Sequence, residues 1–261
     1  MRYVYADQSS AITGVTSSLV ATWTGAQFPA TLWGTGGVTV VAGHLRVMTT
    51  VLVLGENTFP FHEIEGKADY FESILADHDV TVTTDRDALT GEYDVLVDYL
   101  TDSALTDEQL DALLTHVAEG GGYVGVHCAS DLTSTASDDP DEVLDHREEP
   151  FPELRELVGG QFLTHPEDSE FGVDIVGDHP VVAGVDDFSV FDEPYQVDVD
   201  EDITVLARMD HPDLEDYPVV WTNESEGHVA YISLGHTDEA FESDAFGQLL
   251  RNAVAWAADE A

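Results

Sequence analysis

The sequence predicts an α/β protein built on a parallel sheet. From residue 48 onward, short apolar strands alternate with amphipathic helices, which is the pattern of repeated βα units. A second observation is the stretch from Gly120 to Asp131, which ends a helix, runs through an apolar strand and places His127 and Cys128 on a turn of small residues. Such a strand–turn–helix elbow exposes one side chain, here that of His127, at the carboxyl end of a parallel strand, where ligands bind.

The first elements follow the βα pattern closely. A strand is expected at Val51–Leu54, and a loop that contains His62 leads from it into a helix at about Lys67–Ala76. Two further strands are expected at Val80–Thr83 and Tyr93–Leu100.

The next helix has clear signals at both ends. Thr106 and Gln109 form the pattern of a capping box, and the apolar residues after them recur at helical spacing. These apolar residues are Leu110, Leu113, Leu114 and Val117. The glycine run 120–122 ends the helix in the way that a left-handed cap requires. It is not expected to bind phosphate, because a phosphate loop follows a strand and precedes a helix.

The second half of the chain continues as one domain. An acidic loop is expected at 131–150, and no repeat, low-complexity tract or linker interrupts residues 48–261. The remaining predicted elements are a short helix at Glu153–Val158, strands near Val205–Met209, Val219–Trp221 and His228–Leu234, and a final helix from about Asp244 to Ala258.

The charge of the chain excludes several classes of partner. It carries 53 acidic and 8 basic residues, a formal net charge of −45. Nucleic acid and anionic membranes both attract basic patches, so neither is an expected partner. Disorder is also excluded, because 43% of the residues are hydrophobic and fall in periodic runs. We therefore expect a folded, halophilic protein from an acidic proteome, since high salt screens the mutual repulsion of the carboxylates.

Residues 1–47 differ sharply from the rest. They contain one acid, Asp7, and two arginines, Arg2 and Arg46, whereas residues 48–261 contain 52 acidic and 6 basic residues. This contrast predicts that Met48 is the natural start and that 1–47 is a non-native or misassigned extension. The alternative is a less charged arm that packs in an oligomer, and a homodimer is the assembly kept open.

Cysteine usage and hydropathy indicate the compartment. The chain has a single cysteine, which excludes an intramolecular disulfide and a thiolate metal cluster. No window of 18 consecutive apolar residues is present, and the first 25 residues lack the basic start and apolar block of a secretion signal. We therefore expect a cytoplasmic protein.

Three histidines follow predicted strands or lie in the loops after them. His62, His127 and His236 are far apart in sequence, but the carboxyl ends of parallel strands meet at one edge of a sheet. Asp238, two residues after His236, is placed to orient its ring as a carboxylate does in a nucleophilic triad. The alternative is that each is a solvated or structural residue, with Cys128 an inert buried thiol. Taken together, the three histidines favour a cleft site.

Nine short motifs follow one another along the chain. They are Tyr93–Val97, Leu105–Gln109, Gly120–Asp131, Leu157–Phe162, His165-Pro166, His179-Pro180, Asp192–Tyr195, Pro218–Trp221 and Ser233–Thr237. In this order they resemble the ThuA, or trehalose-utilisation, family, and the resemblance covers Met48 to Ala258. It implies the class I glutamine amidotransferase-like fold, a flavodoxin-like three-layer sandwich with a mostly parallel sheet, and a role in sugar catabolism.

The resemblance also makes glutaminase activity unexpected. True amidotransferases carry cysteine in the elbow and a His-x-Glu pair near the C-terminal helix. Here His127 occupies the cysteine position, and His236 with Asp238 resembles the His-x-Glu pair. An imidazole cannot replace the thiolate that forms the thioester, whereas it suits proton transfer or metal binding.

Three further residues enter the candidate site. Glu193 is either a solvated charge, as is usual for a carboxylate at the end of a strand, or a site residue, as the Asp-Glu-x-Tyr motif of the resembled family implies. His165 precedes a proline, which favours an ordered turn. Tyr195 is either a core aromatic residue or a wall on which a sugar stacks.

The expected function is an enzyme, a sugar isomerase or hydrolase, that acts on a keto-sugar or disaccharide derivative by acid–base chemistry. The residues expected to be catalytic are His127, His236, Glu193 and Asp238, and those expected to bind substrate are His62, His165, Tyr195 and Cys128. A divalent metal is left open as a cofactor, and the expected partner is a small-molecule sugar. One alternative is a non-catalytic sugar-binding or regulatory module, and another makes Cys128 a nucleophile.

Overall fold

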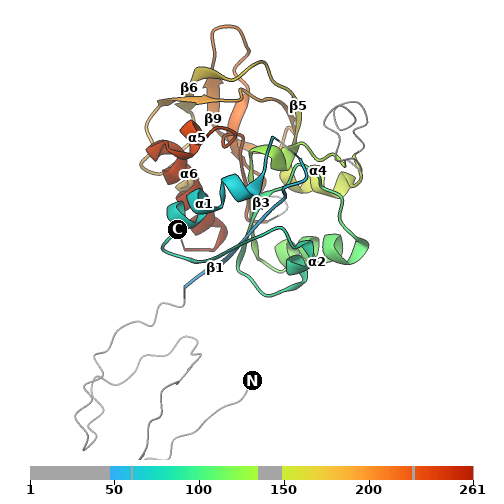
Figure 1. Ribbon diagram of the computed structural model, residues 1–261. Coiled ribbons are helices and arrows are strands. Elements are labelled where there is room, and N and C mark those ends of the chain that lie inside the picture. Colours follow the sequence, from blue (N-terminus) through green and yellow to red (C-terminus); the bar gives the residue numbers. More distant parts are fainter. Residues whose placement is uncertain (1–47, 60, 135–148, 225–226, 261) are drawn as a thin grey trace, which may run out of the picture. The chain divides into compact units, whose positions relative to one another are not determined.

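The computed structural model describes residues 48–59, 61–134, 149–224 and 227–260. The predicted extension, residues 1–47, and most of the predicted acidic loop lie outside the described residues and stay predictions. Residues from Met48 onward group into one compact unit, which is coloured in Figure 1.

Five parallel strands form one half of the central sheet. In chain order they are β1 (Thr50–Gly55), β2 (Asp79–Thr83), β3 (Val95–Tyr99), β4 (Gly122–Val126) and β11 (Val229–Ile232). Side by side their order is β2-β1-β3-β4-β11, and every neighbouring pair is parallel. All residues of β3, β4 and β11 are buried, as expected of parallel strands that are covered on both faces. The carboxyl ends of these strands therefore share one edge.

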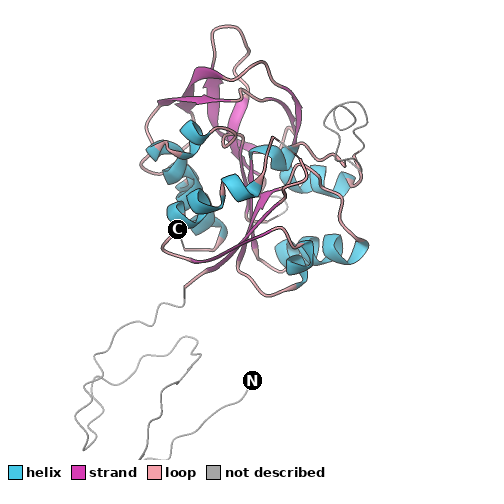
Figure 2. Ribbon diagram, viewed as in Figure 1, coloured by secondary structure: helices cyan, strands magenta, loops and turns pink. Residues whose placement is uncertain are grey.

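Helices cover both faces of this sheet. On one face α1 (Ala68–Ile74) and α6 (Asp244–Ala257) pack against the side chains of Val51 and Val53 in β1. The alternate residues of β1, Leu52 and Leu54, point to the other face, where they share a core with α2 (Asp107–Ala118) and α4 (Pro152–Val158). Figure 2 shows the strands between the two groups of helices. The predicted three-layer α/β architecture is confirmed.

The predicted start and end of α2 are both present. The Thr106 hydroxyl accepts the backbone N–H of Gln109, and the Gln109 side chain accepts the backbone N–H of Thr106. After the helix, Gly120 adopts a φ of 98°, which favours glycine. The helix ends there and the chain turns into β4.

The second half of the sheet is antiparallel. After β11 it continues through β10 (Pro218–Thr222), β9 (Thr204–Asp210), β6 (Ser169–Ile175) and β7 (Phe188–Asp192). No strand is predicted between Gly159 and Val197, yet β6, β7 and a further strand at Gly160–Thr164 lie there. Strands β6 and β7 are only partly buried: Glu170 and Asp174 interrupt the apolar pattern of β6, and in β7 the exposed Ser189 and Phe191 alternate with buried residues.

Several short elements complete the described chain. β5 (Gly160–Thr164) and β8 (Gln196–Val199) form a separate antiparallel pair. The short helices are η1 (Ile64–Gly66), η2 (Arg86–Thr90), η3 (His127–Ser130), η4 (Pro180–Val182) and α5 (Asp238–Phe241). Of these, η3 follows β4 directly, so the predicted elbow is a strand that enters a single helical turn.

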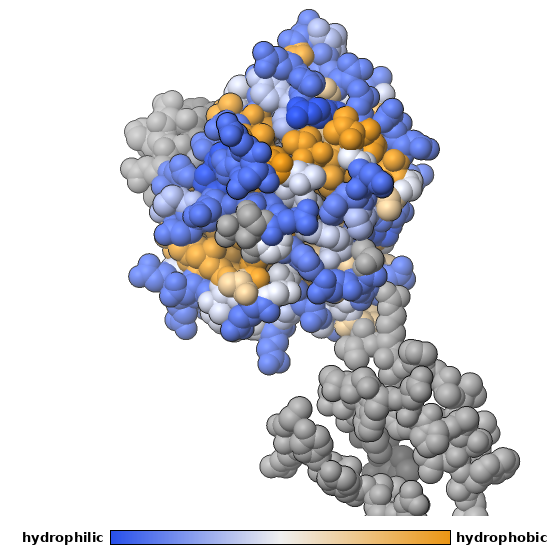
Figure 3. Space-filling view, turned by 180° about the vertical axis from the view of Figure 1, so that it is seen from behind, coloured by the Kyte–Doolittle hydropathy of each residue, from blue (hydrophilic) through white to orange (hydrophobic). Residues whose placement is uncertain are grey.

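Figure 3 shows hydrophilic residues over most of the face that it presents, with hydrophobic residues gathered in limited patches. Among the described residues, no helix is long and apolar enough to cross a membrane.

Candidate functional site

Four side chains converge beside the carboxyl ends of the parallel strands. His62 lies in the loop after β1, His127 follows β4 directly, His236 follows β11, and Glu193 follows β7. Each offers a ligand atom, and these atoms all lie within 4.8 Å of one another. We call these four residues the histidine–glutamate cluster. The predicted meeting of the three histidines is thus present in the structure.

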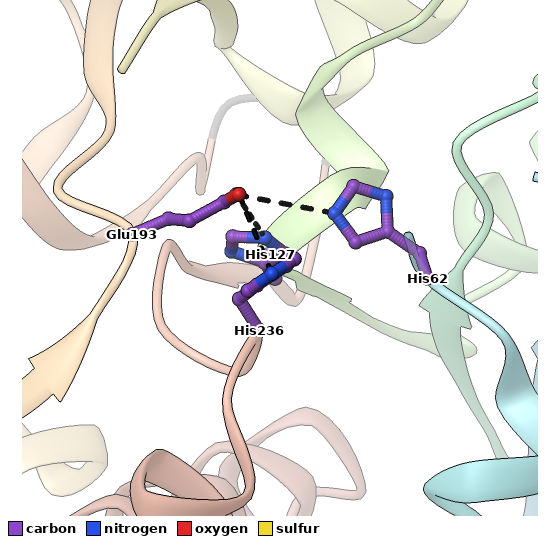
Figure 4. Close-up of side chains that lie close together, drawn as sticks. All are labelled: His62, His127, Glu193 and His236. Atoms are coloured by element: carbon purple, nitrogen blue, oxygen red, sulfur yellow. Dashed lines mark ion pairs between the residues drawn. The ribbon is translucent and has the colours of Figure 1, made fainter. Parts of the chain in front are cut away.

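The carboxylate of Glu193 lies between the three rings (Figure 4). Its Oε2 is 3.2 Å from His127 Nε2 and 4.0 Å from His62 Nε2, and its Oε1 is 3.4 Å from His236 Nε2. The centres of the three imidazole rings are 4.9 to 5.3 Å apart. The ligand atoms of the four residues therefore lie close to one another.

His127 occupies the elbow in a strained conformation. Its φ of 47° is unusual for a residue other than glycine, and such strain concentrates at functional sites. Its Nδ1 lies 2.8 Å from the carbonyl oxygen of Ser233, and its ring packs against Tyr195 at 4.1 Å. The elbow pattern predicts an exposed side chain here, but His127 is 0% exposed and its ring packs against that of Tyr195.

Neighbouring residues hold the other two rings in place. His62 Nδ1 is 2.7 Å from Thr101 Oγ1, and the ring stacks on Phe59 at 5.3 Å. The loop of His236 is held by the buried carboxylate of Asp192, which accepts the backbone N–H groups of Gly235, His236 and Thr237.

Asp192 is a positioning residue that the sequence analysis missed. It was quoted only as part of the Asp-Glu-x-Tyr motif, where two adjacent acids give no sign of which one faces the cluster. The alternation of a strand was the available signal, because consecutive residues at the end of β7 point in opposite directions.

Burial and mutual contact set the charges of the cluster. Burial lowers the pKa of His62 to about 3, so this ring is neutral. Burial, followed by the neighbouring His127, also lowers the pKa of His236. Burial alone acts to lower the pKa of His127, but contact with Glu193 outweighs it and the pKa is raised. Burial acts to raise the pKa of Glu193, whereas its contacts with His127 and His62 lower it, so Glu193 is ionised.

The cluster leaves buried polar atoms without partners. Within the described residues, His62 Nε2, His127 Nε2, Glu193 Oε2 and His236 Nδ1 are buried and have no hydrogen-bond partner. Such atoms are rare in folded proteins, because each one costs about 1–3 kcal/mol. Their gathering at one point is what a ligand site requires.

The other predicted site residues take different positions. His165 lies at the rim, with its Nε2 3.6 Å from Glu193 Oε1 and its side chain 35% exposed. Tyr195 is 2% exposed and packs between His127 and Phe162, which favours the core aromatic over the sugar-stacking wall.

Asp238 and Cys128 lie outside the cluster. The Asp238 carboxylate is 64% exposed and accepts a hydrogen bond of 2.6 Å from Lys67 Nζ, so the carboxylate that contacts the His236 ring is that of Glu193. Cys128 is 0% exposed within the core, and burial raises the pKa of its thiol well above the usual range. A buried thiol with a raised pKa is a poor nucleophile, as the inert reading of Cys128 expects.

A separate cavity of about 300 Å³ lies at the opposite ends of the strands. It is lined by residues that precede β3 and β4, among them Asp94 and Gly121, and by the end of α6. None of the cluster residues lines it. Its position away from the carboxyl ends of the strands makes it the weaker candidate for a functional site.

The fold and the cluster define an α/β protein whose elbow carries histidine in place of a nucleophile. The family model described as ThuA, trehalose utilisation, matches residues 50–257. The chain belongs to this family. Among curated proteins, no match was found.

Solved structures give the same fold. A ThuA-like protein from Bacteroides uniformis is 22% identical with a TM-score of 0.63, covering 80% of this chain and 91% of that one. A ThuA-like protein from Parabacteroides merdae is 16% identical with a TM-score of 0.65, covering 81% and 90%. A cytoplasmic protein from Salmonella typhimurium is 14% identical with a TM-score of 0.53, covering 78% and 98%.

Proposed function

We propose that this protein is a sugar-catabolism enzyme that acts on a keto-sugar or a keto derivative of a disaccharide at the histidine–glutamate cluster. The observation that carries the proposal is the convergence of three imidazoles and one carboxylate on one point, with buried atoms that lack partners. The family's association with trehalose utilisation supports a sugar as the substrate class.

The chemistry of the cluster suits a carbonyl substrate. Isomerisation or hydrolysis of a keto-sugar requires removal of a proton next to a carbonyl group and protonation of an oxygen. Glu193 is ionised and is suited to accept a proton, whereas His127 has a raised pKa and is suited to donate one. His165 and His236 both approach Glu193 Oε1, with their Nε2 atoms at 3.6 and 3.4 Å, and the partly exposed His165 extends this acid–base set toward the rim.

Exposed apolar side chains flank the site residues in sequence. Phe61, Leu163 and Phe191 are 52%, 55% and 42% exposed. Phe61 precedes His62 and contacts Phe59, the residue on which the His62 ring stacks. Ligand sites combine apolar surface with a few convergent polar groups, and a sugar ring offers both kinds of face.

Turnover of defined sugars tests the proposal. The full chain, in molar KCl because of its proposed halophilic adaptation, is incubated with trehalose, with glucose, and with each sugar carrying one hydroxyl oxidised to a ketone. Product formation is followed by NMR. We expect turnover of a keto-sugar, with kcat/KM reduced about 100-fold or more in Glu193→Gln and His236→Ala.

A matched control is Glu170→Gln, which removes an exposed carboxylate from the neighbouring strand β6 and should leave turnover unchanged. Saturable binding of a keto-sugar without turnover would show that the protein is a sugar-binding module and not an enzyme. Neither turnover nor binding across the panel would overturn the sugar proposal.

A further inference from the structure

We propose that the histidine–glutamate cluster binds one divalent transition-metal ion, with His62, His127, His236 and Glu193 as its ligands. Their ligand atoms already lie within 4.8 Å of one another. Ligands bound at 2.0–2.2 Å in a tetrahedral zinc site are about 3.4 Å apart, so small side-chain movements bring all four into range. His62 and His127 are at most 5% exposed and Glu193 is 8% exposed, so this is a built site rather than a surface cluster.

The hydrogen bond of His127 determines which nitrogen is free. A backbone carbonyl only accepts, so His127 Nδ1, 2.8 Å from Ser233 O, carries the proton in that bond. In its neutral form the ring presents the lone pair of Nε2 toward Glu193 Oε2, 3.2 Å away. This lone pair and the carboxylate oxygen repel at that distance unless a cation, either a proton on Nε2 or a metal ion, lies between them. A metal ion supplies that cation and uses both lone pairs.

His62 and His236 are also held by hydrogen bonds to neighbouring residues. Metal-binding histidines commonly bond through the second ring nitrogen to a protein oxygen, which fixes the tautomer and the orientation of the ring. His62 Nδ1 meets the Thr101 hydroxyl at 2.7 Å, and its Nε2 faces Glu193 without a hydrogen-bond partner among the described residues. Asp192 fixes the backbone of His236. The site is thus held in place before an ion binds.

The donor set indicates the class of ion. Imidazole nitrogens suit zinc, iron, nickel and copper, whereas magnesium and calcium prefer sites made of oxygen atoms. Three imidazoles and one carboxylate therefore favour a first-row transition metal over the alkaline-earth ions.

Metal binding does not rest on the proposed sugar chemistry, because it is measured without a sugar. If the ion is bound, its Lewis acidity is available to polarise a substrate carbonyl. His165 is the histidine beside the cluster that is not one of the four ligands. With the other four residues bound to the ion, the imidazole of His165 at the rim would be available for proton transfer.

The test is the metal content of the full chain. The protein is stripped with a chelator, dialysed against excess Mg²⁺ to occupy the surface carboxylates, loaded with Zn²⁺ and desalted. Metal per chain is measured by mass spectrometry, and Co²⁺ loading is followed by its visible absorption. We expect one zinc per wild-type chain and a loss of affinity of more than 100-fold in His127→Ala and in Glu193→Gln.

The control is His228→Ala. His228 precedes β11 at the end opposite to His236 and pairs with Asp259, so its loss should leave one zinc per chain. Circular dichroism establishes which variants fold, and the comparison uses those that do. Equal zinc loading of the wild type and any folded cluster variant, or equal loss in His228→Ala, would overturn the proposal.

Discussion

Two buried polar groups lie near the same edge of the sheet and are built in opposite ways. In the first, which we call the Glu56 network, Glu56 Oε1 accepts the backbone N–H groups of Thr101 and Asp102 at 3.1 and 2.6 Å. Its Oε2 accepts the hydroxyl of Thr58, and Arg86 ties the network to the backbone oxygen of Asp102 at 2.8 Å. In the second, the histidine–glutamate cluster, four buried atoms have no partner among the described residues.

This difference distinguishes buried polar groups that stabilise the fold from buried polar groups that are available to a ligand. Thr101 belongs to both groups, because its N–H bonds to Glu56 and its hydroxyl bonds to His62. A satisfied network holds loops in place and gains nothing from a ligand, whereas unsatisfied atoms are costly until a ligand binds them. The Glu56 network thus fixes the loop against which the cluster is built. The predictions below test this division of roles.

The largest loss of unfolding free energy is expected from a substitution of Asp192, which holds the loop of His236 and lies next to Glu193 in sequence. Asp192→Ala removes the acceptor of three backbone N–H groups in a fully buried place, and we expect a loss of about 3–5 kcal/mol of unfolding free energy. Urea unfolding measures it. A loss below about 1 kcal/mol would show that the loop of His236 does not depend on Asp192.

A smaller loss of unfolding free energy is expected from a substitution of Arg86 in the Glu56 network. Arg86 donates to the carbonyl oxygens of Ala104 and Asp102 and lies 3.6 Å from the carboxylate of Glu56. Arg86→Ala should cost about 2–3 kcal/mol, because it leaves these acceptors and a buried carboxylate without their partner. Zinc loading should be unchanged.

The control for Arg86 is Arg208→Ala. Arg208 is 37% exposed and pairs with an exposed carboxylate, so its removal should change stability by less than about 0.5 kcal/mol. Equal effects of the two substitutions in thermal or urea unfolding would contradict a structural role for the network.

The buried carboxylate of Asp98 should make the stability of the protein depend on pH. Burial raises its pKa from 3.8 to about 6, although Tyr123 and the N–H of Leu100 donate hydrogen bonds to it. The folded state therefore binds the proton more tightly than the unfolded state. The destabilisation by the buried charge is fully present above about pH 6, falls as the pH is lowered, and is absent below about pH 4.

Asp98→Asn carries no charge at any pH, so it should be more stable than the wild type at pH 8 by about 2 kcal/mol, and the two should converge near pH 4. Urea unfolding of both proteins across this range measures the difference. A difference that does not vary with pH would contradict the raised pKa of Asp98.

Much of the fold could be predicted from the sequence because local signals agreed. The capping box of Thr106 and Gln109, the glycine cap at Gly120 and the apolar runs of the parallel strands all indicated the observed elements. The antiparallel strands β6 and β7 could not be predicted, because only two residues of each are buried: Phe171 and Val173 in β6, and Val190 and Asp192 in β7. Where β6 begins and ends depends in part on its pairing with β9, which is distant in sequence.

The site was predictable only in part for the same reason. Topology brings strand ends together, and this was enough to place His62, His127 and His236 in one cleft. Which acid faces them depends on the direction of each side chain. Asp238 turns to Lys67 and Asp192 turns to the backbone, which leaves Glu193 as the carboxylate of the cluster.

The central claim is that the cluster is kept for a ligand and not for stability, and Glu193→Gln tests it most directly. The amide of glutamine removes a buried charge and can donate to Nε2 of His127 or His62, which offsets the lost contacts of the carboxylate with these rings. With a chelator present, the unfolding free energy of Glu193→Gln should lie within about 1 kcal/mol of the wild type. A loss as large as that expected for Asp192→Ala would show that the cluster is structural.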